Sequence, residues 1–371
     1  MNLAVVLSND WELFGDGSGD FETIQSGPGK TLMRIAEKHG AKMTFMAETG
    51  QQKAHLALAA THAWAADASA AWEAFLQDAA TRGHGVEAHL HPQWLASNHG
   101  PEGWKLGLDW WALPNVPEAT RKEALKWSKE YLETIVRKKI PGYHCHAFRA
   151  GSFCMMPSHQ TSRELLALGI DCDSSVCKGQ SMRTKIGGYD YRSAHSYAAP
   201  YDANCDDIRK CRPGSGLLEM PILSRPATDL PLLRKLGLFA RRLERIPTDE
   251  KKRQLERRRR LETLYPSQRR PISNNPDIDW HWLADKLIRR GSLVMDYDFV
   301  PPSVIIETLR AVAENHQGDG VLPVTLIGHA KNMVLEDDFD ALLSGINATF
   351  GGTIRYLTLK EASQQWRQRR S

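Results

Sequence analysis

Short apolar segments of strand length alternate with amphipathic segments of helix length along most of the chain. Residues 3–8 form an apolar run that predicts a buried strand, and an acidic, glycine-rich loop follows it. Residues 30–39 place apolar side chains at helical spacing before Gly40, which is typical of a helix C-terminus, and 42–46 predict a second strand. The alternation continues through predicted helices at 65–82, 118–138, 160–168, 302–315, 335–348 and 360–368, and predicted strands at 85–92, 143–148, 217–222, 293–296, 323–328 and 354–357.

This alternation indicates the class of fold. Strands that alternate with helices form mainly parallel sheets, because each helix returns the chain to the start of the next strand. The 371 residues are long enough for about two to three domains of average size, but a barrel of β/α units accommodates them in one. We therefore predict an α/β fold, a distorted (β/α) barrel that forms a single domain over 1–371, with irregular loops over 178–215.

The segment 227–278 interrupts the alternation and concentrates positive charge. The chain has 48 Lys and Arg against 44 Asp and Glu, and this net charge of +4 would be small for a nucleic-acid-binding protein. The charge is clustered, however, as in the run KKRQLERRRR over 251–260. One interpretation is a solvated helical insertion; the other is a basic surface over 231–271 that binds a phosphate-bearing substrate or contacts acidic lipids. Nucleic acid is the less favoured partner, because apolar side chains lie over 233–239.

The N-terminus and the cysteines indicate where the protein works. The first apolar run is short for a signal peptide and no basic residue precedes it, and no segment approaches the roughly 18–20 consecutive apolar residues of a membrane span. We expect a soluble, cytoplasmic protein whose basic segment could place it at the inner membrane surface. Its cysteines are then expected to be reduced thiols, and their spacing matches no strong zinc motif. They are Cys145, Cys154, Cys172, Cys177, Cys205 and Cys211.

Polar residues that could carry chemistry lie at the predicted C-terminal ends of three strands. Asp10 and Glu12 follow the first strand, His89 and His91 end the third, and His329 follows a strand near the C-terminus. Alternate residues of an extended segment point to the same side, so the members of each pair face the same way. Barrels of this kind assemble their active sites at this end, and two imidazoles with one carboxylate are a typical catalytic zinc set.

Other interpretations of these residues stay open at this point. A His-x-His pair can equally be two surface or core histidines, and the carboxylates can cap a loop or form salt bridges. A second pair, His144 and His146, competes for the metal, but it lies within a predicted strand rather than at its exit. The glycine-rich segment 27–31 does not match a phosphate-binding loop, because Ile24 stands where that motif requires glycine.

Taken in order, these segments and several others resemble the motifs of the polysaccharide deacetylases of the NodB type, carbohydrate esterase family four. The resemblance is to a divergent branch in which Asp-x-Glu or Asp-x-Asp replaces the usual first motif, and the two histidines lie closer together here than in the usual metal motif. It spans roughly 1–226 and 280–365. The segments that carry it are Ser8–Glu12, Thr31–Phe45, Glu87–Pro92, Phe148–Phe153, Asp173–Val176, Leu218–Pro221 and Leu326–His329.

The resemblance implies a hydrolase that binds one divalent metal ion, usually Zn²⁺, and removes an N- or O-acetyl group, or another small acyl group, from a saccharide. His89 and His91 would bind the metal together with Glu12, and Asp10 would be the general base. An exchange of roles between the two carboxylates, with Asp10 as the ligand, stays open.

The same resemblance implies roles for three further residues. His329 would be the general acid, Arg149 would orient the base carboxylate, and Asp173 would hold a partner such as His329 in the required tautomer. Each has a structural alternative, namely a packed histidine, a salt bridge and a turn cap, respectively.

The lack of an export signal favours a cytoplasmic substrate, such as a sugar nucleotide or a lipid-linked intermediate of glycan biosynthesis. Trp94, Trp104, Trp110 and Trp111, with the loop 189–201, could form a glycan-binding rim or pack as a small core. Two other functions compete. One is hydrolysis of a non-sugar amide on the same scaffold, as in allantoinase-like relatives, and the other is non-catalytic binding of an anionic glycan or nucleic acid by the basic insertion.

Overall fold

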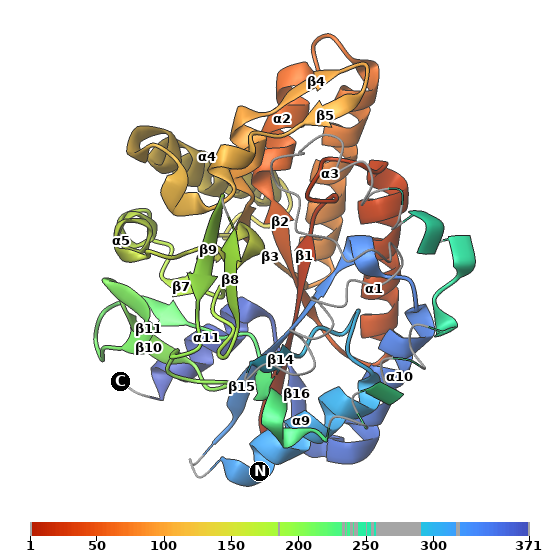
Figure 1. The fold of residues 1–371 in the computed structure, drawn as a ribbon, viewed down its shortest axis with the longest axis vertical. Helices are drawn as coiled ribbons and strands as arrows, with labels where there is room; N and C mark the ends of the chain where they lie inside the picture. Colours follow the sequence, from red (N-terminus) through yellow and green to blue (C-terminus); the bar gives the residue numbers. More distant parts are fainter. Residues whose placement is uncertain are drawn as a thin grey trace.

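A 10-stranded sheet forms the centre of the protein (Figure 1). The computed structural model describes residues 2–231 except Lys185, and residues 291–369 except 317–319; between these ranges it describes only 234, 236–237, 240, 244–249, 251–253 and 256. The strand order is β11 (Asp207–Cys211), β10 (Tyr201–Asn204), β12 (Leu218–Glu219), β7 (Cys172–Asp173), β6 (Ala147–Ala150), β3 (Gly85–Leu90), β2 (Met43–Glu48), β1 (Leu3–Trp11) and β15 (Leu322–His329), and β16 (Ile354–Tyr356) also pairs with β1.

The part of the sheet from β12 to β15 is parallel throughout and curls back on itself. Ile222, just after β12, forms a parallel bridge with Thr325 of β15, and Asp296 forms another with Ile327. The Leu223 N–H also donates to the Thr325 carbonyl at 2.7 Å. These contacts join the two ends of the parallel sheet, so the predicted α/β fold with a distorted barrel is confirmed.

Helices pack around the outside of the sheet (Figure 1). All nine residues of β1 are buried, as expected for a parallel strand that is covered on both faces. The apolar positions predicted for the first helix, Leu32, Ile35 and Ala36, are buried in the core. The main helices are α1 (Gly27–Lys38), α3 (Ala63–Thr81), α4 (Glu118–Arg137), α5 (His159–Ala167), α9 (Pro302–Asn315), α10 (Glu336–Phe350) and α11 (Leu359–Gln368).

Three local expectations differ from the structure. Helix α2 (Thr49–Leu58) is missing from the sequence prediction. Much of its buried face is polar, so its apolar residues do not recur at helical spacing. The segment 178–215 is not all irregular; it contains β10, β11 and the hairpin of β8 (Ser181–Thr184) with β9 (Gly187–Asp190). The strand predicted over 143–148 begins only at Ala147, so the competing pair His144 and His146 lies before β6 and not inside it.

The basic insertion is described only in part. Most of 227–278, including the arginine run 257–260, lies outside the described residues, so its helical character and its role stay predictions. Arg234 forms an ion pair with Glu307 of α9 at 2.6 Å, and Arg245 pairs with Asp338 of α10. At least these two basic side chains therefore contact acidic groups of the barrel's own helices.

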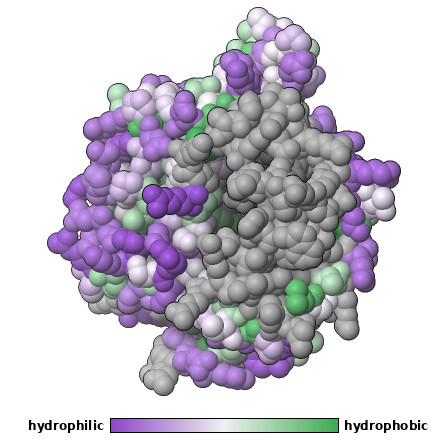
Figure 2. Space-filling model, in the orientation of Figure 1, coloured by the Kyte–Doolittle hydropathy of each residue, from purple (hydrophilic) through white to green (hydrophobic). Residues whose placement is uncertain are grey.

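The remaining features of the described residues concern membrane-spanning helices, the surface and the cysteines. Among the described residues, no helix is long and apolar enough to cross a membrane. On the face shown in Figure 2, hydrophilic residues predominate in the described surface, and hydrophobic residues occur in small groups. All six cysteines are free, as expected.

Candidate metal centre and catalytic site

The carboxyl ends of neighbouring strands bring most of the predicted site residues together. In the parallel register, Asp10 of β1 lies opposite His329 of β15. Glu48, His89 and Arg149 align across β2, β3 and β6. Parallel strands end at the same edge of a sheet, so residues far apart in the sequence meet at one site.

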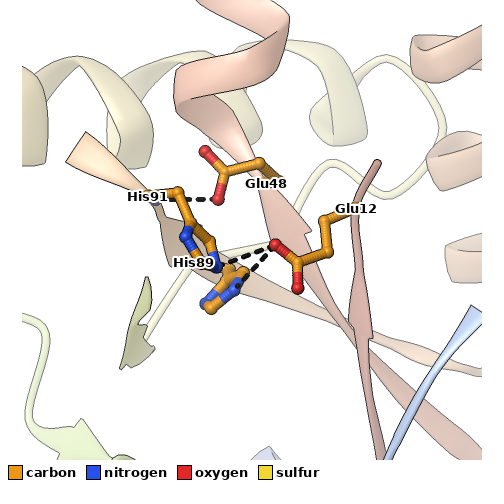
Figure 3. A group of neighbouring side chains, drawn as sticks. All are labelled: Glu12, Glu48, His89 and His91. Atoms are coloured by element: carbon orange, nitrogen blue, oxygen red, sulfur yellow. Dashed lines mark hydrogen bonds and ion pairs between the residues drawn. The ribbon is translucent and has the colours of Figure 1, made fainter. Parts of the chain in front are cut away.

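Glu12 and the two histidines form the centre of this site (Figure 3). The Glu12 Oε2 atom lies 2.8 Å from His91 Nε2 and 3.6 Å from His89 Nε2. Glu48 completes a group in which one potential ligand atom from each residue lies within 4.8 Å of the others, and all four residues are buried. Two imidazole nitrogens that converge on one carboxylate oxygen are an arrangement typical of a metal site.

The hydrogen bonds of His89 fit a metal ligand. Its Nδ1 lies 2.9 Å from the Arg149 carbonyl oxygen, which can only accept, so Nδ1 carries a proton and Nε2 is the nitrogen that a metal ion could bind after losing its proton. Its Nε2 is buried and lacks a hydrogen bond in the described structure, because its carboxylate neighbours, Glu12 Oε2 at 3.6 Å and Asp10 Oδ2 at 3.9 Å, lie beyond hydrogen-bond distance. A buried polar atom without a partner is uncommon, and a backbone carbonyl on the other ring nitrogen is the arrangement that orients metal-binding histidines. The residues present therefore fit a divalent metal ion.

Glu48 is a site residue that the sequence reasoning missed. Its carboxylate oxygens accept the backbone N–H groups of Gly50 and His91, each at 2.8 Å, so it caps α2 and fixes the backbone of a proposed ligand (Figure 3). Burial raises its pKa, and the charges of His91 and His89 partly oppose this rise. Glu48 lies just after the strand predicted over 42–46, and this position is the sequence feature that could have identified it as a site residue.

Arg149 holds Asp10 in place. The Arg149 Nη1 atom lies 2.5 Å from Asp10 Oδ1, and the rest of the guanidinium donates to Ser8 Oγ and to the Ser174 carbonyl and hydroxyl. The Asp10 Oδ2 atom lies 3.9 Å from His89 Nε2. Burial acts to raise the pKa of Asp10, but Arg149 together with nearby histidines outweighs it and lowers the pKa. Asp10 is therefore ionised, with one oxygen held and the other directed toward the metal group.

His329 lies between two carboxylates. Its Nε2 is 3.7 Å from Asp10 Oδ2, and its Nδ1 is 3.3 Å from Asp296 Oδ2. Burial acts to lower the pKa of His329, but Asp296 and Asp10 outweigh it and raise the pKa. The geometry thus favours a protonated imidazole. Asp296 is the last residue of the strand predicted at 293–296, and the sequence reasoning did not assign it to the site.

The expected pairing of Asp173 with His329 is wrong, because Asp296 takes that position. The Asp173 carboxylate accepts the backbone N–H and the hydroxyl of Ser175, both at 2.9 Å. It also lies beside Glu219 in the parallel register of β7 and β12, and burial raises the pKa of both carboxyl groups. The described hydrogen bonds of Asp173 are therefore those of a turn cap on the backbone that follows β7.

The competing histidine pair lies elsewhere. His146 Nδ1 is 2.8 Å from Glu87 Oε1, and the side chain of His144 is 68% exposed beside Glu133. Both histidines precede β6, so they lie at the opposite end of that strand from Arg149 and the metal group. Neither belongs to a group of potential metal ligands among the described residues.

Similarity to known proteins was found at the level of structure only. No family model matches the sequence, and no curated protein sequence matches it. The fold is similar to a Mycobacterium smegmatis protein assigned as a polysaccharide deacetylase, at 14% identity and a TM-score of 0.49 over 100% of this chain and 91% of the other. It is also similar to the peptidoglycan deacetylase PdaC from Bacillus subtilis, at 12% identity and a TM-score of 0.35 over 100% and 94% of the two chains.

A third similar structure comes from another class of enzyme. The 4-alpha-glucanotransferase from Thermococcus litoralis matches at 14% identity and a TM-score of 0.46, over 98% of this chain and 40% of the other.

Proposed function

We propose that this protein is a metal-dependent deacetylase that acts on a saccharide. The observation that carries the proposal is the convergence of His89 Nε2 and His91 Nε2 on Glu12 Oε2, directly beside Asp10. An ion site next to an ionised carboxylate and a protonated histidine contains the groups that hydrolysis of an amide or ester requires.

His89, His91 and Glu12 would hold the metal ion. The Arg149 carbonyl fixes the tautomer of His89, and the Glu48 carboxylate fixes the backbone of His91. When bound, a divalent ion supplies Lewis-acid chemistry, because it polarises an acyl carbonyl and makes water acidic enough to react near neutral pH. Zn²⁺ is the proposed ion, since two imidazoles and one carboxylate suit it.

Asp10 and His329 would move the protons. Arg149 occupies Asp10 Oδ1, so Oδ2 is the oxygen available to accept a proton from the attacking water. His329 would donate the proton that the leaving sugar nitrogen or oxygen needs, and Asp296 holds it in the charged form. The 3.7 Å between Asp10 Oδ2 and His329 Nε2 lets one reacting group contact both residues.

The saccharide class is supported by the ordered set of motifs in the sequence. We propose a cytoplasmic intermediate of glycan biosynthesis as the substrate, either a sugar nucleotide or a lipid-linked saccharide. The basic segment 231–271 would then contact its phosphate or the membrane that carries it.

The test is release of acetate by the purified full chain. Acetylated sugars, sugar nucleotides, oligosaccharides and small non-sugar amides are assayed before chelation, after chelation and after addition of Zn²⁺. We expect activity on at least one saccharide that chelation abolishes and Zn²⁺ restores. Activity on non-sugar amides alone would support amide hydrolysis instead, and activity on extracellular polymers alone would contradict the substrate assignment.

Two variants make the test specific to this site. His89→Ala should lose the bound metal, measured by elemental analysis, and at least about 100-fold in kcat/KM, as expected when a metal ligand is removed. His144→Ala changes an exposed histidine outside the site and is the matched control, with metal content and activity retained. Full activity in His89→Ala would contradict the mechanism.

A further inference from the structure

Two buried carboxyl groups, which the proposed proton transfers do not use, lie on neighbouring strands of the sheet. Asp173 of β7 and Glu219 of β12 are partners in the parallel register, and both residues are 0% exposed. Residues that pair across neighbouring strands point to the same face of a sheet, so the two carboxyl groups face the same way. Two carboxylates that share a buried site repel each other, and one of them then usually keeps its proton.

The hydrogen bonds around the pair indicate which oxygen carries the proton. Both Asp173 oxygens accept donors of Ser175, and Glu219 Oε1 accepts the Val176 N–H at 3.1 Å. Glu219 Oε2 is buried and accepts no hydrogen bond from any group that the structure describes. A buried polar atom without a bond is uncommon, whereas a protonated carboxyl group has an O–H that donates. Glu219 Oε2 is therefore the oxygen that can donate to the Asp173 carboxylate.

Other polar groups near the pair direct their hydrogen bonds elsewhere. The described hydrogen bonds of the Arg149 guanidinium go to Asp10 and to two serines. The hydroxyl groups of Tyr191 and Tyr201 donate to backbone carbonyls at 2.7 and 2.8 Å. Burial and the neighbouring Asp173 hold the pKa of Glu219 well above its usual range, and the charge of Arg149 only partly opposes this rise.

The pair is connected to the proposed catalytic site through the turn that follows β7. The Ser175 hydroxyl donates to the Asp173 carboxylate at 2.9 Å and accepts the Ala150 N–H at the same distance. The neighbouring Ser174 accepts hydrogen bonds from Arg149 at its carbonyl oxygen and at its hydroxyl. Arg149 in turn binds the proposed general base. The carboxyl pair can therefore affect the base through hydrogen bonds alone, without contact with the substrate.

We propose that Asp173 and Glu219 share one proton, carried by Glu219 Oε2, and that this hydrogen bond positions Arg149 and, through it, Asp10. The effect on catalysis depends on the proposed deacetylase function, but the presence of the proton does not. Glu219 is thus a positioning residue whose neutral carboxyl group stabilises the turn after β7. A second negative charge at this place would instead repel the Asp173 carboxylate.

Infrared spectroscopy of the full chain detects the proton. A protonated carboxyl group has a C=O stretching band that a carboxylate lacks, so the difference spectrum between wild type and Glu219→Gln at neutral pH should show the loss of this band. Glu164→Gln is the matched control, because Glu164 is a buried carboxylate that pairs with Arg121 at 2.7 Å, and it should lose carboxylate bands only. A difference spectrum for Glu219→Gln that shows only carboxylate bands would overturn the proposal.

Kinetics and hydrogen exchange test the positioning. Gln keeps a donor at this place, whereas Glu219→Met removes it. We expect Glu219→Met to lose about tenfold in kcat with little change in KM, the size expected for loss of one buried hydrogen bond, and Glu219→Gln to stay near the wild type. The Ala150 N–H should exchange faster in Glu219→Met only.

The exchange measurement keeps this proposal separate from the proposed activity. Faster exchange in Glu219→Met alone would support the positioning even where no acetate is released, and absence of acetate release would then count against the deacetylase function alone. Equal effects of the two variants on kcat and on exchange would overturn the proposal. A comparable loss of kcat in Glu219→Gln would overturn it even where Glu219→Met does not fold.

Discussion

Lys331 Nζ lies 2.6 Å from Glu12 Oε1, the carboxylate oxygen that does not face the two imidazoles. The Lys331 side chain is only 14% exposed, so this ion pair is largely shielded from water. Burial acts to raise the pKa of Glu12, but His91 and Lys331 outweigh it and hold the pKa well below its usual range. The pair joins the exit of β15 to the exit of β1 and presents Oε2 of an ionised carboxylate to the proposed metal.

Substitution of Lys331 should therefore lower activity through the position of Glu12. Lys331→Met removes the donor to Oε1, and we expect kcat/KM at saturating metal to fall by about 10- to 100-fold, as for other groups that orient metal ligands. Lys331→Arg keeps a charged donor and should recover part of the loss. Steady-state kinetics of the wild type, Lys331→Met and Lys331→Arg measure these changes in kcat/KM. Equal losses in both variants would contradict a role for the donor itself.

The Arg149–Asp10 pair should contribute to stability as well as to chemistry. Arg149→Met leaves the buried Asp10 carboxylate without its partner, and we expect the free energy of unfolding to fall by about 3–5 kcal/mol. The double variant Arg149→Met with Asp10→Asn removes the uncompensated charge and should regain much of this stability while staying inactive. Urea unfolding of the two variants measures the difference. A double variant no more stable than Arg149→Met would contradict this account.

The metal-free protein should lose stability as the solution becomes alkaline. Burial acts to lower the pKa of His89, but Asp10 and Glu12 outweigh it and raise the pKa to about 9. A folded-state pKa above the unfolded one stabilises the protein at pH values below both, and this contribution is lost as the pH rises through about 9. Urea unfolding of the chelated protein from about pH 6 to 10 should show this decline, and His89→Ala should show less of it.

Metal binding should show the opposite dependence on pH. A metal ion competes with the proton on His89 Nε2, so the apparent affinity should rise with pH up to about 9, and binding should release protons. Calorimetric titration with Zn²⁺ in buffers of different ionisation enthalpy measures the protons released. An affinity that does not change with pH would place the ion elsewhere.

Asp296 and Asp173 can be distinguished by kinetics. Asp296→Asn removes the charge that raises the pKa of His329, so the alkaline fall of the pH–rate profile should move to lower pH. Asp173→Asn changes a carboxyl group that binds Ser175, and the position of the alkaline fall should stay as in the wild type. If the alkaline fall moved in Asp173→Asn and not in Asp296→Asn, Asp173 would be the carboxylate that acts on His329, as the motif resemblance implies.

Local patterns in the sequence were sufficient for the architecture and for part of the site. Helix α9 appears over the predicted residues, and β1 extends three residues beyond the predicted strand, through Asp10 to Trp11. The period-two argument for His89 and His91 also holds, because both imidazoles face Glu12. These features depend on residues near one another in the chain, where side-chain spacing determines which face is buried.

The other half of the site was decided by which strands are neighbours. Glu48, Asp296 and Lys331 each lie at a strand exit, yet nothing local distinguishes them from other polar residues at loop starts. Only the parallel register, with β1 between β15 and β2 and with the bridge from Asp296 to β15, places these groups around Glu12 and His329. The sequence by itself thus determined the elements and the candidate ligands. The tertiary structure alone decided their partners, because contacts between distant strands depend on sheet order and not on local spacing.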